Sequence, residues 1–222
     1  MLIRFPKRLL DNTVFDNLQT KYKFSIIQYI INSKYRTKEK LQGWLKAQVQ
    51  NPSIKLQEVA QSIEFGNSYD ECMMNILSYV RNNLKYTPDS TVWKSEEYWA
   101  TANEIVEGMK DDCDGGATLI YVLARLKGVP ANRLLIFAGD VEGGGHAWLG
   151  YKPEEYPLNW TFLDWCYWVN LRSIKDRPKF EIQKKRIIEY KNDLETKDSN
   201  YKSIWFGVNE DFGYTELVYS SK

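Results

Sequence analysis

The chain has 222 residues, of which 43% are hydrophobic and 27% charged, so it is long and apolar enough to bury the core of one or two domains. Lysine and arginine number 30 against 29 acidic residues, a net charge of +1, which excludes the basic excess typical of a dedicated nucleic-acid-binding protein. No apolar run approaches the roughly 20 residues of a membrane-spanning helix, and the first residues lack a signal-peptide pattern. We therefore expect a cytoplasmic protein with no membrane and no nucleic-acid partner.

Apolar residues at helical spacing dominate the first third of the chain. They predict helices between residue 12 and about 65, and we treat 1–66 as a helical N-terminal region that precedes one further unit over 67–222. Another helix is expected over 69–84. The segment 86–99 is irregular and rich in aromatic residues.

Two further helices have recognisable ends. Thr101 and Glu104 fit a capping box at the start of a short helix that reaches residue 109. A second helix begins near Asp112-Cys113 and carries apolar residues at i, i+3, i+4 and i+7, namely Ala117, Ile120, Tyr121 and Ala124. Gly128 followed by Pro130 marks its end.

Short apolar strands follow the helices. We expect strands over 134–138, 146–151 and 160–165, with a glycine-rich turn at 142–145 and one or two more strands within 203–219. Helices that come first and strands that come later, without alternation, predict an α+β fold with an antiparallel sheet. The highly charged stretch between these strands, 175–202, is interpreted as a solvated helix or loop.

Cysteine and histidine content limits the possible chemistry. Three cysteines cannot all pair and none forms a C-x-x-C motif, so no disulfide framework is expected, and we interpret Cys72 and Cys166 as small buried hydrophobic residues. His146 is the only histidine, which excludes sites that need two or three imidazoles. A zinc site made from Cys113, Cys166, His146 and Asp164 ranks last, because no two ligands are closely spaced. We expect no metal and no cofactor.

Cys113 stands at the start of the apolar helix, where exposed backbone N–H groups stabilise a thiolate and lower the thiol pKa. Asp112 and Asp114 flank it, and like charge raises a thiol pKa, so helix-start geometry alone leaves the activation undecided. A nearby imidazolium would settle it by forming a thiolate–imidazolium pair. Gly115 and Gly116 remove side-chain bulk next to the cysteine, which predicts room for a substrate backbone.

His146 opens a strand directly after three glycines, an arrangement that leaves its ring open to a ligand. Asp164 lies in an otherwise apolar, aromatic strand, where a buried carboxylate needs a partner. If the two strands are neighbours, Asp164 accepts a hydrogen bond from one imidazole nitrogen and the other nitrogen faces Cys113. Two plainer interpretations stay open: a structural histidine, and an Asp164 that pairs with Arg133 or Lys152.

Four short motifs, preceded by Trp99-Ala-Thr-Ala-Asn-Glu104, follow one another in a fixed order: Asp112-Cys113-Asp-Gly-Gly-Ala117, Gly128-Val-Pro130, Gly145-His-Ala-Trp148 and Leu163-Asp164. On these motifs the segment 98–165 resembles the transglutaminase-like superfamily, a branch of the papain-type cysteine enzymes. Its style is that of the bacterial transglutaminase-like cysteine peptidases. The resemblance leaves residues 1–65 and 175–222 unassigned.

The resemblance implies a papain/transglutaminase-like core, with the nucleophile helix packed on an antiparallel sheet, over 67–222. It implies an acyl-enzyme cycle in which Cys113 attacks a carbonyl, His146 accepts and later donates the proton, and Asp164 orients the imidazole. The oxyanion would be held by the backbone N–H of Cys113 and by one upstream side-chain donor. Candidates for that donor are Trp99, Trp93 and Tyr86.

Three functions follow from the resemblance in different measure. The first is hydrolysis of a peptide or carboxamide bond in a peptide or protein substrate. The second is protein-glutamine γ-glutamyltransferase activity, in which an amine replaces water as acyl acceptor. The third is a non-catalytic binding or assembly module on the same fold. In a calcium-dependent, adhesin-processing branch of the family, acids beside the cysteine bind Ca²⁺; Asp112 and Asp114 are the matching positions, but the lack of a leader pattern argues against that secreted role.

Overall fold

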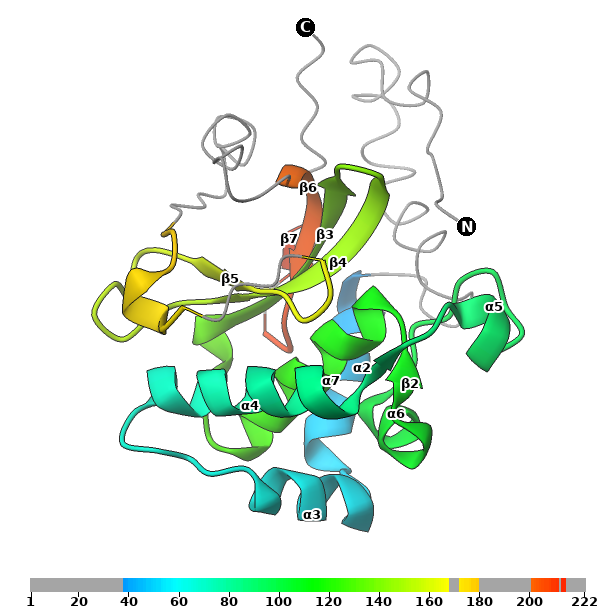
Figure 1. Cartoon of the computed structure of the whole chain (residues 1–222), viewed down its shortest axis with the longest axis horizontal. Helices are drawn as coiled ribbons and strands as arrows, with labels where there is room; N and C mark the ends of the chain where they lie inside the picture. The colour runs from blue at the N-terminus through cyan, green and yellow to red at the C-terminus, as the bar shows by residue number, and fades with distance from the viewer. Residues whose placement is uncertain (1–37, 168–171, 180–200, 212, 215–222) are drawn as a thin grey trace, which may run out of the picture.

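The structure, a computed structural model, describes residues 38–167, 172–179, 201–211 and 213–214 (Figure 1). Its helices in chain order are α2 (Lys38–Gln50), α3 (Ile54–Ser62), α4 (Tyr69–Asn83), α5 (Asp89–Val92), α6 (Ala102–Gly108) and α7 (Cys113–Leu126), with the 3-10 turns η2 (Ala131–Arg133) and η3 (Ile174–Asp176). Its strands are β1 (Lys85–Tyr86), β2 (Lys110–Asp111), β3 (Leu134–Val141), β4 (Gly144–Tyr151), β5 (Thr161–Leu163), β6 (Tyr201–Val208) and β7 (Gly213–Tyr214).

One antiparallel sheet of five strands, in the order β5-β4-β3-β6-β7, forms the second half of the fold, and β1 and β2 form a separate parallel pair. Helices α3, α4 and α7 gather on one side of the sheet instead of alternating with its strands (Figure 1). The predicted α+β class is therefore confirmed. A tight turn joins β3 to β4, and Gly143 and Gly144 there have φ of 107° and 142°, which side-chain-bearing residues rarely adopt.

Helix α7 lies at the centre of the larger core and touches α2, α4 and β4. Apolar side chains surround it on every side, and a helix of that pattern is stable only when it is buried. Its fully buried side chains include Leu119, Ile120, Tyr121, Val122 and Leu123. Each buried aliphatic side chain of this size contributes about 1.5–3 kcal/mol through burial. The first residue of the helix, Cys113, is thereby held rigidly against the sheet.

The sheet is covered on both faces because its strands alternate between two apolar clusters. On β3, Ile136 and Ala138 join the cluster that contains α7, whereas Leu135 and Phe137 join a second cluster on the opposite face. That second cluster is aromatic and also holds Trp148, Trp160, Phe162 and Tyr201. It fixes the end of the sheet where the site lies.

Most of the predicted elements are present with shifted ends. The capping box at Thr101 and Glu104 is formed in both directions. Strand β3 runs three residues further than expected because its end pairs with β4 and β6, and neither pairing can be read from local periodicity. The helix expected before residue 38 and the charged segment over 180–200 lie outside the described residues. Within the described ranges no helix is long and apolar enough to cross a membrane.

Candidate active site

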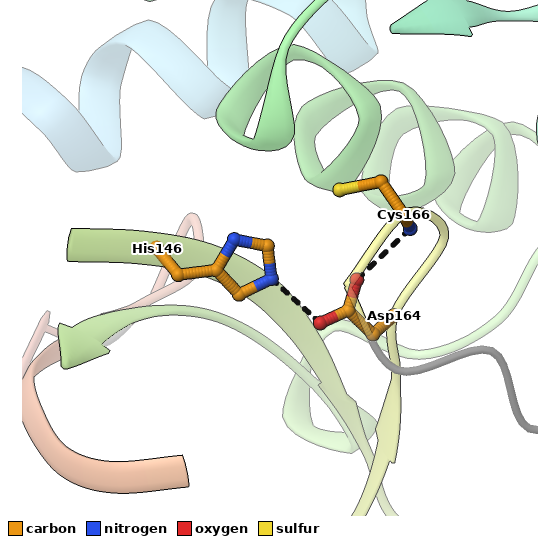
Figure 2. A group of neighbouring side chains, drawn as sticks. All are labelled: His146, Asp164 and Cys166. Atoms are coloured by element: carbon orange, nitrogen blue, oxygen red, sulfur yellow. Dashed lines mark hydrogen bonds and ion pairs between the residues drawn. The ribbon is translucent and has the colours of Figure 1, made fainter. Parts of the chain in front are cut away.

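Strands β4 and β5 are neighbours, and their pairing brings His146 and Asp164 together. The distance between His146 Nε2 and Asp164 Oδ2 is 2.6 Å, and both side chains are buried (Figure 2). The predicted hydrogen bond between the carboxylate and one imidazole nitrogen is therefore present, and the alternative pairing of Asp164 with Arg133 or Lys152 is not. Because Asp164 occupies Nε2, the free nitrogen of the ring is Nδ1.

Four donors surround the carboxylate of Asp164. Oδ1 accepts the backbone N–H groups of Cys166 and Tyr167, each at 3.1 Å, and Oδ2 accepts the hydroxyl of Tyr201 as well as His146. Burial by itself would raise the pKa of Asp164, but the nearby His146 and these hydrogen bonds together hold it below its usual value. The group is therefore an ionised carboxylate in a dry environment.

Cys113 is the first residue of α7 and is half-buried. The backbone N–H of Ala147 donates to its thiol, so the sulfur lies against β4 next to the residue that follows His146. In the described part of the chain the thiol makes no hydrogen bond to the imidazole itself; catalytic hydrogen bonds are often long before substrate binds. Burial, followed by the charges of Asp112 and Asp114, raises the pKa of the thiol well above its usual value.

The three candidate oxyanion donors have different environments. Trp99 and Trp93 each donate the indole N–H to a carboxylate, at 3.1 Å and 3.3 Å, and Trp99 is fully buried in the core. Tyr86, on β1, is 53% exposed. Burial of its hydroxyl and the charge of Cys113 raise the pKa of Tyr86, which places this side chain close to the thiol. Of the three, Tyr86 is the best positioned to reach a substrate.

The glycines after Cys113 serve packing, which corrects our expectation that they leave room for a substrate backbone. A β-carbon added at Gly115 would collide with the side chain of Asp111, and one added at Gly116 would collide with the indole of Trp165. The indole N–H of Trp165 also donates to the backbone carbonyl of Cys113 at 3.4 Å. Both glycines therefore let neighbouring side chains close over the start of α7.

The two other cysteines differ from each other. Cys72 is fully buried in the core, as predicted. Cys166, in contrast, is half-buried, and its sulfur, a nitrogen of His146 and a carboxylate oxygen of Asp164 lie within 4.8 Å of one another (Figure 2). Its interpretation as a simple core residue is therefore wrong. Burial and the charge of Asp164 raise the pKa of its thiol, so it is a neutral neighbour of the site.

Five acidic side chains lie near the start of α7, and we call them the carboxylate cluster: Asp89, Glu97, Asp111, Asp112 and Asp114. Asp89 is within 4.8 Å of Asp111 and Asp112 in one group and of Glu97 and Asp114 in another. Burial and mutual repulsion raise the pKa of Asp89 to about 7 and those of Glu97 and Asp111 to about 8. Sequence reasoning singled out only Asp112 and Asp114.

Comparison with known proteins gives likenesses of structure only. No protein-family model and no curated protein matches the sequence. Among solved structures, LapG of Legionella pneumophila is similar over 76% of this chain and 87% of its own, with 18% identity and a TM-score of 0.49. A candidate cysteine protease from Cytophaga hutchinsonii matches over 60% and 45%, with 23% identity and a TM-score of 0.40. A TGase matches over 74% and 42%, with 17% identity and a TM-score of 0.36.

These neighbours are of the kinds that the motif resemblance names, but the scores lie below 0.5 and the identities below 25%. We therefore derive the function from the side-chain geometry of this chain.

Proposed function

We propose that this protein is a cysteine-nucleophile hydrolase that cleaves a peptide or carboxamide bond through Cys113, His146 and Asp164. The observation that carries the proposal is the 2.6 Å hydrogen bond from the only imidazole of the chain to a buried carboxylate. Two further facts support it: the thiol lies at the start of a rigid helix, and it is bound to the backbone N–H of Ala147, next to His146.

Each side chain then has a definite task in an acyl-enzyme cycle. Asp164 holds a proton on Nε2 of His146, so Nδ1 accepts the thiol proton, and the resulting imidazolium is stabilised by the carboxylate. The sulfur of Cys113 adds to the substrate carbonyl. The backbone N–H of Cys113 and, in our assignment, the hydroxyl of Tyr86 donate to the developing oxyanion.

The second half of the cycle uses the same groups in reverse. Collapse of the tetrahedral intermediate breaks the C–N bond, and the imidazolium of His146 protonates the departing amine to leave a thioester on Cys113. A water molecule then gives a proton to Nδ1 and attacks the thioester, which releases the acid and the thiol. If an amine takes the place of water, the product is a new amide, and the enzyme is a transglutaminase.

The acyl acceptor is tested by supplying both acceptors in one experiment. Incubation with casein and a labelled primary amine is expected to release new N-termini with little incorporated label, because water at the thioester is far more concentrated than any amine. Cys113→Ala should lose at least a thousandfold of either activity, since it removes the nucleophile. Cys72→Ala, which removes a buried thiol of the core, is the matched control and should retain the activity.

Two other outcomes of this experiment would change the assignment. Label incorporation without new N-termini would assign the protein as a transglutaminase. Wild-type protein and Cys113→Ala that are equally inactive on a panel of amides, yet bind the same partner, would contradict the hydrolase and favour the binding module.

We propose in addition that the carboxylate cluster holds a divalent cation, in contrast to our expectation from the sequence alone. Asp89, Asp111 and Asp114 are at most 3% exposed, yet each has a buried carboxylate oxygen that accepts no hydrogen bond. Within the described ranges no lysine or arginine forms an ion pair with any member of the cluster. Buried carboxylates need such compensation, and several hard oxygen ligands of this kind favour Ca²⁺. A bound cation would supply positive charge beside Cys113 and oppose the effect of the acids on its thiol.

The cation proposal is tested by thermal unfolding, which does not depend on activity. Saturating Ca²⁺ is expected to raise the Tm by about 5–10 °C, because a ligand at a hundred times its Kd stabilises a protein by about 2.7 kcal/mol. Asp89→Asn should abolish most of this rise, since Asp89 belongs to both groups of the cluster. Glu107→Gln, an exposed acid outside the cluster, is the control and should keep the full rise. A wild-type Tm that Ca²⁺ and Mg²⁺ leave unchanged would contradict the proposal.

A further inference from the structure

Tyr201 reaches the site from a part of the chain that the motifs do not cover. It is the first residue of β6, its side chain is 0% exposed, and its hydroxyl donates to Oδ2 of Asp164, the same oxygen that binds His146. A carboxylate has about four acceptor positions, and in Asp164 all four are used, by two backbone N–H groups, His146 and Tyr201. Tyr201 is thus the only side chain besides His146 that donates to this carboxylate in the described part of the chain.

The local backbone places this tyrosine in an unusual way. Strand β6 pairs with β3 so that Asp140 lies opposite Ser203 but Val141 lies opposite Tyr201, which leaves Lys202 as an extra residue in a β-bulge. Side chains alternate between the faces of a strand, so without the bulge Lys202 would lie opposite Val141 and the tyrosine ring would move out of place. Bulges often redirect a side chain next to an active site.

The ring of Tyr201 is also held firmly. Its centroid lies 4.7 Å from that of Trp148 and 5.0 Å from that of Phe162, within the aromatic cluster on the far face of the sheet. Neither neighbour offers the hydroxyl another acceptor at this end of the ring. A rigid donor of this kind fixes the plane of the Asp164 carboxylate.

We propose that Tyr201 is a positioning residue of the catalytic centre: its hydroxyl fixes the Asp164 carboxylate, which in turn fixes the tautomer and orientation of His146. This inference rests on the function proposed above and extends it by a fourth residue, supplied by β6. With the hydroxyl removed, Oδ2 keeps one donor only, and the carboxylate is free to turn about its bond toward Oδ1. The imidazole then presents Nδ1 to the thiol less often.

The test compares two buried tyrosines that both donate to a carboxylate. Tyr201→Phe removes the bond to Asp164, and Tyr151→Phe removes a bond of 2.6 Å to Asp70 at the other end of β4, so both variants lose the same chemical group. The readout is the rate at which iodoacetamide alkylates Cys113 at pH 7, which needs no substrate. We expect about a tenfold slower rate in Tyr201→Phe and less than a twofold change in Tyr151→Phe, with similar losses of Tm.

A second readout uses the single histidine of the chain. The proton on Nε2 of His146 gives a unique downfield NMR signal, and we expect it to shift and broaden in Tyr201→Phe but to stay in place in Tyr151→Phe. Equal alkylation rates in the two variants together with an unchanged signal would overturn the proposal. If Tyr201→Phe does not fold, wild-type protein decides, because the Nε2 proton must show a nuclear Overhauser contact with the Tyr201 hydroxyl proton across their shared acceptor.

The failure of this inference can be told from the failure of the proposed function. If His146→Ala leaves the alkylation of Cys113 unchanged, the thiol–imidazole pair does not exist and the hydrolase proposal falls. If His146→Ala slows alkylation but Tyr201→Phe does not, the catalytic pair stands and only the role of Tyr201 is lost.

Discussion

Replacing Asp164 by asparagine is expected to lower kcat/KM by about 10⁴-fold while the chain stays folded. The two backbone N–H groups of Cys166 and Tyr167 determine this outcome. They require an acceptor at the Oδ1 position, so the carbonyl oxygen of the asparagine must face them and its NH₂ group must take the place of Oδ2. That NH₂ group then points at Nε2 of His146.

The consequence of this substitution is the wrong tautomer of the imidazole. A donor opposite Nε2 forces that nitrogen to become an acceptor, and the ring proton moves to Nδ1, where it blocks transfer of the thiol proton. The hydroxyl of Tyr201 can turn to accept from the new NH₂ group, so no buried donor is left unpaired and the fold is retained. The measurement is kcat/KM together with the Tm. Activity within tenfold of the wild type would contradict the assignment of Asp164.

The contact between His146 and Asp164 could be predicted because both residues carry strong local signals. A histidine after a glycine turn and an acid in an apolar strand each mark a position in an element, and the pairing of consecutive strands is the commonest arrangement. Their joint order with the cysteine at a helix start added the third position. The capping box of Thr101 and Glu104 was predictable for the same reason, since its signal lies within four residues.

Asp89, Glu97 and Tyr201 carry no such signal. Asp89 and Glu97 lie in a segment without periodicity, and only the packing of that segment against the start of α7 brings their carboxylates close to Asp112 and Asp114. Tyr201 is one of 15 tyrosines, and a β-bulge decides which face of the sheet it joins. An extra residue in a strand shifts the register by one, and local composition does not encode that shift. Contacts set by long-range register and loop packing therefore stay beyond sequence patterns.

Gly115 and Gly116 show a different limit. Their small size is visible in the sequence, and we attributed it to substrate access. The structure assigns the same property to close packing, because Asp111 and Trp165 fill the space that a β-carbon would need. A glycine indicates that something approaches closely, but the sequence does not say whether that partner is a ligand or the protein itself.

His146→Ala is expected to slow the alkylation of Cys113 by iodoacetamide at pH 7 by about 30-fold or more. The reason is the environment of the thiol: burial and the acids Asp112 and Asp114 raise its pKa well above the usual value, so without a cationic partner it is almost entirely protonated at neutral pH. An unperturbed thiol is only a few per cent thiolate at pH 7, whereas pairing with an imidazolium brings that fraction close to one. The wild-type rate should therefore be nearly flat between pH 6 and 8.

The pH dependence makes this prediction specific. In His146→Ala the rate should rise about tenfold for each pH unit over the same range, since only the thiolate reacts and its pKa lies above the range. Cys166 is also half-buried and near the site, so alkylation must be followed at Cys113 itself by mass spectrometry, with Cys113→Ala as the blank. A wild-type rate that rises as steeply as that of the variant would show that the imidazole does not activate the thiol. In that case the bond of His146 to Asp164 would be a structural contact, as the plainer interpretation of a lone histidine holds.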